Sequence, residues 1–177
     1  MNKKQLKKLV LSGLFLCIGM LLPLLTAQIK EIGDTLLPMH LPVLLCGFIC
    51  GPVYGFAVGL ILPFLRSLIF HMPPLYPQAV WMAAELMTYG LVSGLAYNGM
   101  ARLIKAKTPR LYLSLITAML SGRVVWGITK AFLLGIGGKA FTLMAFLTGG
   151  FTDALLGIVI QLILVPIIVK VYEKTDK

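Results

Sequence analysis

Charged residues are scarce in this chain: they make up 12% of its 177 residues, and only six are acidic. A soluble domain usually carries about 25% charged residues. Hydrophobic residues make up 59% of the chain, and a domain of this size has too much surface to hide that many apolar side chains. The composition therefore excludes a soluble enzyme, a disordered tail and a secreted disulfide-rich module. We expect lipid to solvate most of the chain.

Motifs for catalysis, metal binding and nucleotide binding are missing as well. Three cysteines, Cys17, Cys46 and Cys50, lie in apolar runs without Cys-x-x-Cys or Cys/His spacing, so neither a disulfide framework nor a zinc site is expected. The pair Gly138-Lys139 is followed by alanine and lacks the earlier glycine of a phosphate-binding loop, so the chain cannot energise transport with ATP alone. We predict that the protein is not an enzyme and has no catalytic residue, cofactor or metal.

Long uncharged runs are what the sequence does contain. At about 20 residues per crossing, the chain is long enough for roughly six helices. We place the breaks between them where proline and glycine gather or where charges interrupt the apolar run. The sequence thus predicts an all-α integral membrane protein, a single six-helix domain over residues 1–177. The helices are expected at Leu9–Ile29, Leu37–Cys50, Val53–Phe70, Gln78–Met100, Leu111–Leu134 and Phe141–Val169. The second is short and follows a proline-rich entry, so a tilted or partly re-entrant course stays open for it, as does a later start for the last helix.

Basic residues are unevenly distributed between the two sets of loops. Eleven lie at the N-terminus, in the segment Arg102–Arg110 and in the C-terminal tail, whereas the loops on the other side hold two, Lys30 and Lys139. A net charge of +10 would suggest a nucleic-acid partner in a soluble protein, but here the charge predicts orientation in the membrane. We expect both termini in the cytoplasm and the bundle to be a multi-pass protein of the plasma membrane, without a nucleic-acid partner.

Five charged residues remain inside the predicted helices, and each is costly in lipid, which makes it a functional candidate. They are Arg66, Glu85, Arg123, Lys130 and Asp153. Counted along their helices, all five fall in the half of the bundle away from the basic loops. Two purely structural roles stay open for them. The charges can form internal ion pairs that hold the bundle together, and a residue near a helix end, such as Lys130, can extend its side chain to the interface.

Aromatic residues gather at the same depth. Trp81 and Tyr89 share a face of their helix with Glu85, because the spacing is i, i+4, i+8. Trp126 lies between Arg123 and Lys130 on the next helix. Flat aromatic walls with a few placed charges suit a small polar ring compound. We therefore predict a substrate-binding site made of His40, Arg66, Trp81, Glu85, Tyr89, Arg123, Trp126, Lys130 and Asp153.

Small residues recur at four-residue spacing, which permits close helix contact in lipid. Gly13 and Cys17 form such a pair on the first predicted helix, and similar pairs follow at 47/51, 55/59 and 90/94. The spacing fits either packing within the bundle or a docking surface for another membrane protein.

The stretch from His40 to Gly59, HLPVLLCGFICGPVYGFAVG, has a Gly-Pro turn after an apolar run, and Pro63 and Arg66-Ser67 follow it. With the basic N-terminus, the chain length and the six predicted helices, it resembles the substrate-binding S components of energy-coupling factor (ECF) vitamin transporters. The resemblance covers nearly the whole chain.

The resemblance implies a bacterial membrane receptor that captures a vitamin or vitamin precursor near the outer face. It also implies a complex with a transmembrane coupling protein and two ABC ATPases, and a docking motif of small residues on the first helix, where Gly13 and Cys17 stand here. A stand-alone transporter or channel, or a structural membrane subunit, remains an alternative. The residues leave the ligand open between a carboxylate such as pantothenate and a neutral pyridine or pyrimidine.

Overall fold

The computed structural model describes residues 2–26 and 36–175, which form helices and no strand. The α-helices, in chain order, are α1 (Lys3–Leu21), α3 (His40–Ile49), α4 (Pro52–Phe70), α5 (Val80–Gly99), α6 (Lys107–Ile136), α7 (Leu143–Leu147) and α8 (Leu155–Thr175). Three short segments complete the set: the 3-10 helix η1 (Leu22–Thr26) and the π-helical turns η2 (Leu75–Ala79) and η3 (Thr148–Thr152).

Within residues 2–26 and 36–175, five helices, counting η1 and η2 with the helices that they adjoin, are long and apolar enough to cross a membrane. These are the segments containing α1, α4, α5, α6 and α8. Helix α3 is as apolar but has only 10 residues, and such a helix rises about 15 Å, half of the roughly 30 Å hydrocarbon core. The predicted all-helical membrane fold is thus confirmed in class, whereas the second predicted helix is too short to cross alone.

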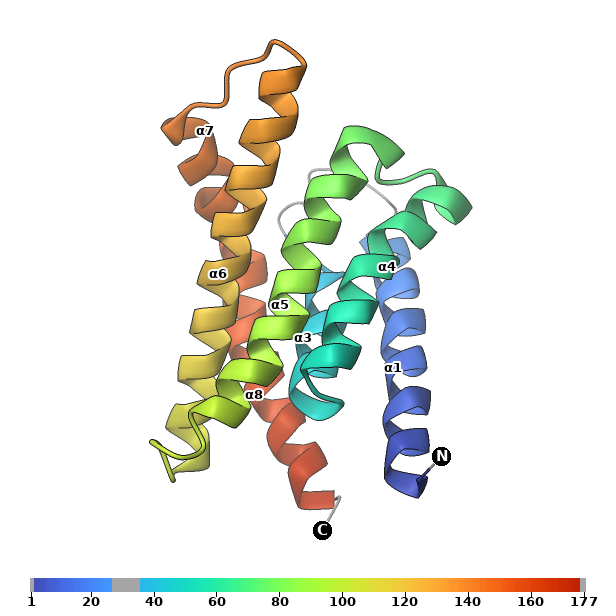
Figure 1. Cartoon of the computed structure of the whole chain (residues 1–177), viewed down its shortest axis with the longest axis vertical. Helices are drawn as coiled ribbons and strands as arrows, with labels where there is room; N and C mark the ends of the chain where they lie inside the picture. The colour runs from blue at the N-terminus through green and yellow to red at the C-terminus, as the bar shows by residue number, and fades with distance from the viewer. Residues whose placement is uncertain (1, 27–35, 176–177) are drawn as a thin grey trace.

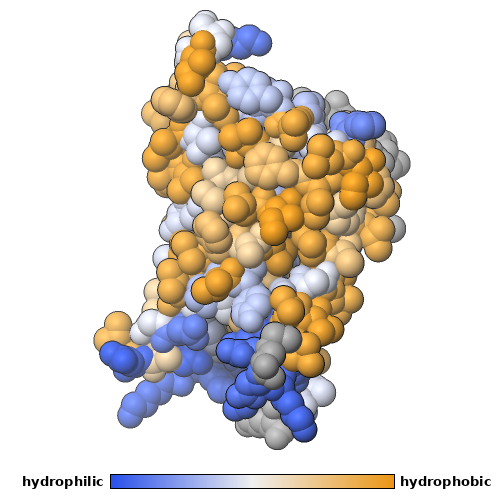
Figure 2. Space-filling view, turned by 45° about the vertical axis from the view of Figure 1, so that its right-hand side comes forward, coloured by the Kyte–Doolittle hydropathy of each residue, from blue (hydrophilic) through white to orange (hydrophobic). Residues whose placement is uncertain are grey.

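The long helices run side by side, and the two ends of the chain lie at the same end of the bundle, together with the α5–α6 connection (Figure 1). The α4–α5 and α6–α7 connections lie at the opposite end. The surface shows an apolar band above a strongly hydrophilic patch at the end that holds the termini (Figure 2). We call this end the basic end, because the lysines of the N-terminus, of the α6 start and of the α8 end belong to it.

The first helix begins earlier than the sequence predicts. Helix α1 starts at Lys3 rather than Leu9, because Asn2 and Gln5 form a capping box in which each side chain bonds the other's backbone N–H. Lysine is also a good helix former. The last residues of the predicted helix, 27–29, lie outside the described residues.

Helices α3, α4 and α5 pack with their backbones in contact. A Cβ atom added to Gly47 or Gly55 would overlap the backbone of Gly90, and one added to Gly59 would overlap the backbone of Leu86. Gly94 similarly meets the backbone of Pro52. The pairs 55/59 and 90/94 and the first member of the pair 47/51 therefore serve internal packing. The predicted break between α3 and α4 lies at Gly51, whose φ of +106° suits glycine alone, followed by Pro52 at the first turn of α4.

The sixth predicted helix, Phe141–Val169, is wrong as one continuous element. The structure divides it into α7, η3 and α8, and α8 continues to Thr175. The break falls at Gly149 and Gly150, which lack the side chains that favour a regular helix. Helix α6 is also longer than the predicted Leu111–Leu134, since its first turn takes in Lys107 and Arg110, which were expected in a loop.

Candidate functional site

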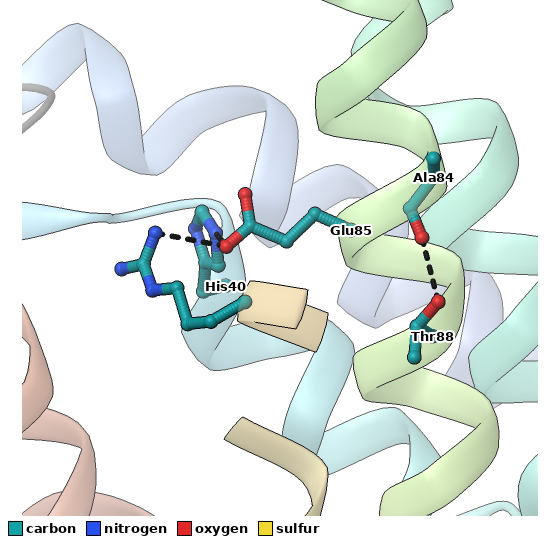
Figure 3. Close-up of polar contacts among 5 residues, drawn as sticks. His40, Ala84, Glu85 and Thr88 are labelled. Atoms are coloured by element: carbon teal, nitrogen blue, oxygen red, sulfur yellow. Dashed lines mark hydrogen bonds and ion pairs between the residues drawn. The ribbon is translucent and has the colours of Figure 1, made fainter. Parts of the chain in front are cut away.

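A buried ion cluster joins three helices in the half of the bundle away from the basic end. Glu85 of α5 accepts a contact of 2.9 Å from Arg123 Nη1 of α6, and the same oxygen lies 3.4 Å from His40 Nε2 of α3. The three side chains are at most 4% exposed. Figure 3 shows Glu85 reaching from α5 toward His40, whereas Thr88, one turn along, bends back to the carbonyl oxygen of Ala84.

Tyr89 lies directly beneath this cluster. Its ring meets the His40 ring edge-on, with 5.2 Å between centroids, and it is fully buried. Helix α6 can approach this closely because Gly122 faces the Tyr89 ring, where a Cβ would overlap the ring carbons. Tyr89 thus supports His40 from below and is not part of the cavity wall described next.

A cavity of about 350 Å³ opens above the ion cluster. It holds seven of the nine residues that the sequence predicts for a substrate site: His40, Trp81, Glu85, Arg123, Trp126, Lys130 and Asp153. Helices α3, α5 and α6 and the end of η3 supply them. The predicted residues therefore lie together, and their contact with a ligand remains a prediction.

Lys130 stands in an aromatic corner of the cavity. Its Nζ lies 4.4 Å from the ring centroid of Trp126, and 5.4 Å from those of Trp81 and Phe141. Ammonium groups over aromatic faces are held by the ring quadrupole, more strongly where water is excluded. The corner fixes the position of the Lys130 charge at the cavity wall.

The part of the cavity wall that the structure describes carries balanced charge. Arg123 and Lys130 stand against Glu85 and Asp153. Arg66, the fifth charged residue of the predicted site, lies elsewhere: it donates to the backbone oxygen of Met20 and packs on the Phe70 ring. It therefore connects α4 to α1 and does not add to the charge of this cavity.

Sequence reasoning missed several residues of the wall. Gln78, Met82, Leu37 and Gly149 also line the cavity, and Phe141 completes the Lys130 corner. A search for charges and tryptophans inside helices does not find them, because they are neutral or lie at helix boundaries. Among the described residues, no group of three His, Cys, Asp or Glu side chains could hold a metal ion.

Gly13 and Cys17 lie on a different surface. Both are exposed on α1, and a Cβ added to Gly13 would meet nothing within 4 Å. Exposed Leu14 and Val10 continue this face. Unlike the glycine pairs of α3, α4 and α5, this pair does not pack against the described bundle.

The comparisons with known proteins identify the family. A family model described as the ECF transporter substrate-specific component matches residues 7–169, which cover most of the chain. A search of curated proteins and a search of solved structures each found no match. The match extends from the first turns of α1 to the last turns of α8 and so takes in every wall of the cavity; the chain belongs to the substrate-specific components of ECF transporters.

Proposed function

We propose that the protein captures a vitamin or vitamin precursor in the cavity above Glu85 and delivers it for uptake driven by partner ATPases. In this proposal the basic end faces the cytoplasm of a bacterium and the cavity faces outward. The chain then crosses the membrane six times, with α3 and the residues before it as the second crossing. Its partners are a transmembrane coupling protein and two ABC ATPases.

The observation that carries the proposal is the cavity itself. Its volume of about 350 Å³ lies within the usual range for small-ligand pockets. Buried charges are costly in a membrane protein and commonly mark substrate pathways, and here Glu85, Arg123 and His40 form the floor of a cavity rather than a sealed core. The aromatic rings of Trp81 and Trp126 stand on its walls.

The charge balance of the wall favours a ligand without net charge. An anion would face Glu85 and Asp153, and a cation would face Arg123 and Lys130. A polar ring compound with separate hydrogen-bond donors and acceptors, such as a pyridine or a pyrimidine, can bond both the acidic and the basic side chains. Of the ligand classes that the sequence leaves open, the neutral ring is therefore favoured over the carboxylate.

Binding should be tested on the purified full chain with a panel of vitamins and precursors. Trp81 and Trp126 line the cavity, so their fluorescence should change when a ligand enters. Transport into liposomes by the protein alone would contradict the dependence on partner ATPases. Absence of binding by every member of the panel would contradict the vitamin proposal.

Asp153→Asn is expected to weaken ligand binding without weakening the fold. Asp153 is exposed at the cavity mouth, so its carboxylate can serve a ligand while contributing little to packing. A hydrogen bond to a charged group is worth about 1.5–3 kcal/mol, which predicts a roughly ten- to hundredfold rise in Kd. Fluorescence titration and a thermal melt on the same preparation measure both effects. Unchanged affinity would remove Asp153 from the site.

A cysteine placed at Lys105 is expected to be protected from an impermeant thiol reagent in intact cells. Lys105 is exposed in the α5–α6 connection at the basic end, and clustered positive charges resist translocation. The experiment uses a Cys17→Ala background, because Cys17 is exposed whereas Cys46 and Cys50 are buried. A cysteine at Lys139, in the α6–α7 connection, is the matched control and should be labelled. The reverse pattern would overturn the orientation.

Gly13→Leu is expected to reduce co-purification of the ATPases while leaving ligand affinity unchanged. Close helix contact in lipid needs small side chains, and the added leucine meets no atom of the described bundle within 4 Å at its Cβ. Gly99→Leu is the control, since Gly99 also has open space around it but lies on α5. Equal loss of partners in both variants, or loss of ligand binding in Gly13→Leu, would contradict docking through α1.

A further inference from the structure

A second polar cavity lies at the basic end, far from the candidate ligand site. It has a volume of about 290 Å³ and is bounded by the first turns of α6 and the last turns of α8. Lys107, Lys170 and Lys174 line it, with Glu173 as the one acidic side chain. Lysines of an N-terminal arm or a loop orient a membrane protein without lining a cavity, so orientation alone does not explain this arrangement.

The carboxylate of Glu173 is already engaged. It accepts a hydrogen bond of 2.6 Å from the Tyr97 hydroxyl and one of 2.7 Å from Lys107 Nζ. Arg110 packs on the other side of the Tyr97 ring, 4.3 Å from its centroid. Lys170 and Lys174 are exposed and one turn apart on the same face of α8. The cavity therefore carries an excess of positive charge at its open side.

The seam between α6 and α8 becomes apolar above this cavity. A further cavity of about 150 Å³ lies roughly 15 Å along α6. Ile116 and Leu120 of α6 and Ile158 and Leu162 of α8 line most of it, and Arg123 and Tyr89 border it at the end nearer the ion cluster. Ile116 and Leu120 are also exposed on the outer surface, so this part of the seam borders the lipid. The seam thus has a cationic end at the membrane boundary and an apolar end within the membrane.

We propose that the α6–α8 seam binds one anionic phospholipid, with its phosphate among Lys107, Lys170 and Lys174 and an acyl chain along Ile116, Leu120 and Leu162. Basic pockets between membrane helices on the cytoplasmic side suit anionic headgroups. A soluble anion would use only the cationic cavity, and an acidic polypeptide would leave the apolar cavity unused. Of these three ligands, only the phospholipid has both an anionic group for the cationic cavity and an acyl chain for the apolar cavity. The headgroup half of this site shares no lining residue with the cavity above Glu85, whereas its apolar half borders Arg123 of the ion cluster.

The test uses the purified full chain in a neutral detergent, with dioleoyl phosphatidylglycerol as probe and dioleoyl phosphatidylcholine as the uncharged comparison. Native mass spectrometry counts the bound lipids. We expect one phosphatidylglycerol to bind in preference to phosphatidylcholine. In K170Q/K174Q, its affinity should fall by roughly thirtyfold, since each lysine near an anionic lipid contributes about fivefold. Both lysines are exposed, so the variant should fold.

The matched control is K3Q/K4Q, which removes two charges from the same end of the bundle, on α1 and outside the cavity. This variant should keep the phosphatidylglycerol. Equal losses in the two variants would show a general surface charge and overturn the site. Competition by sn-glycerol 3-phosphate as effective as by the lipid would show a soluble-anion site instead. Displacement by poly-glutamate at equal charge concentration would show an acidic polypeptide site. Either result would overturn the lipid proposal.

Discussion

Glu85→Gln is expected to lower the free energy of unfolding by about 3–5 kcal/mol, because it leaves the Arg123 guanidinium buried without its counter-charge. Only 4% of the Arg123 side chain is exposed, so water reaching it from the cavity replaces the carboxylate only in small part. His40 loses the same partner. A denaturation or thermal melt of the purified protein measures the effect, and ligand affinity should be followed on the same sample.

Two companion variants make the Glu85 result specific. Thr88→Ala, one turn along α5, removes a hydroxyl that donates only to Ala84 of its own helix, and it should change stability little. The double variant E85Q/R123Q removes both charges and should recover at least half of the loss. If Glu85→Gln alone melted like the wild type while ligand affinity collapsed, the pair would serve the ligand rather than the fold.

Gly90→Ala should destabilise the protein by about 3 kcal/mol or more, since overpacking that must move backbone lies at the upper end of such costs. The added Cβ would overlap the backbone atoms of Gly55, which cannot turn aside as a side chain could. Helices α4 and α5 must therefore separate. The yield of monodisperse protein and its melting temperature are the measurements.

Gly99→Ala is the matched control for Gly90→Ala. Gly99 lies near the end of the same helix, and an added Cβ meets nothing within 4 Å. Alanine is a better helix former than glycine by roughly 0.5–1 kcal/mol, so this variant should be unchanged or slightly more stable. Equal destabilisation by the two substitutions would show that the backbone contact between Gly90 and Gly55 is not the cause.

Much of the fold can be predicted from the sequence, because charged residues are costly within lipid and are therefore rare inside membrane helices. Uncharged runs locate the long helices, and the Gly51-Pro52 pair marks the α3–α4 break in the structure. The charges inside helices are few, so their depth along each helix could be counted. That count places Glu85, Arg123, Lys130 and Asp153 in the same half of the bundle, and they line one cavity.

The sequence does not predict features that depend on which way a side chain points, or on contacts between residues that are far apart in the chain. Arg66 has the same apparent depth as the cavity residues, but its helix turns it toward the Met20 carbonyl oxygen of α1. Helix α6 begins at Lys107, and Glu173, far along the chain, forms an ion pair with that residue. The Gly149-Gly150 break is not visible from hydropathy, since apolar segments, 143–147 and 154–160, lie on both sides of it.

The backbone contacts among α3, α4 and α5 also bear on how such a protein can change over evolutionary time. Positions such as Gly55 and Gly90 admit almost no other residue, because the neighbouring atoms are backbone. Lys130 and Asp153, on the far wall of the cavity, lie outside that glycine contact. Mutation on the α6–η3 side can therefore alter what the cavity recognises while the three-helix frame is inherited unchanged, so specificity and architecture can diverge at different rates.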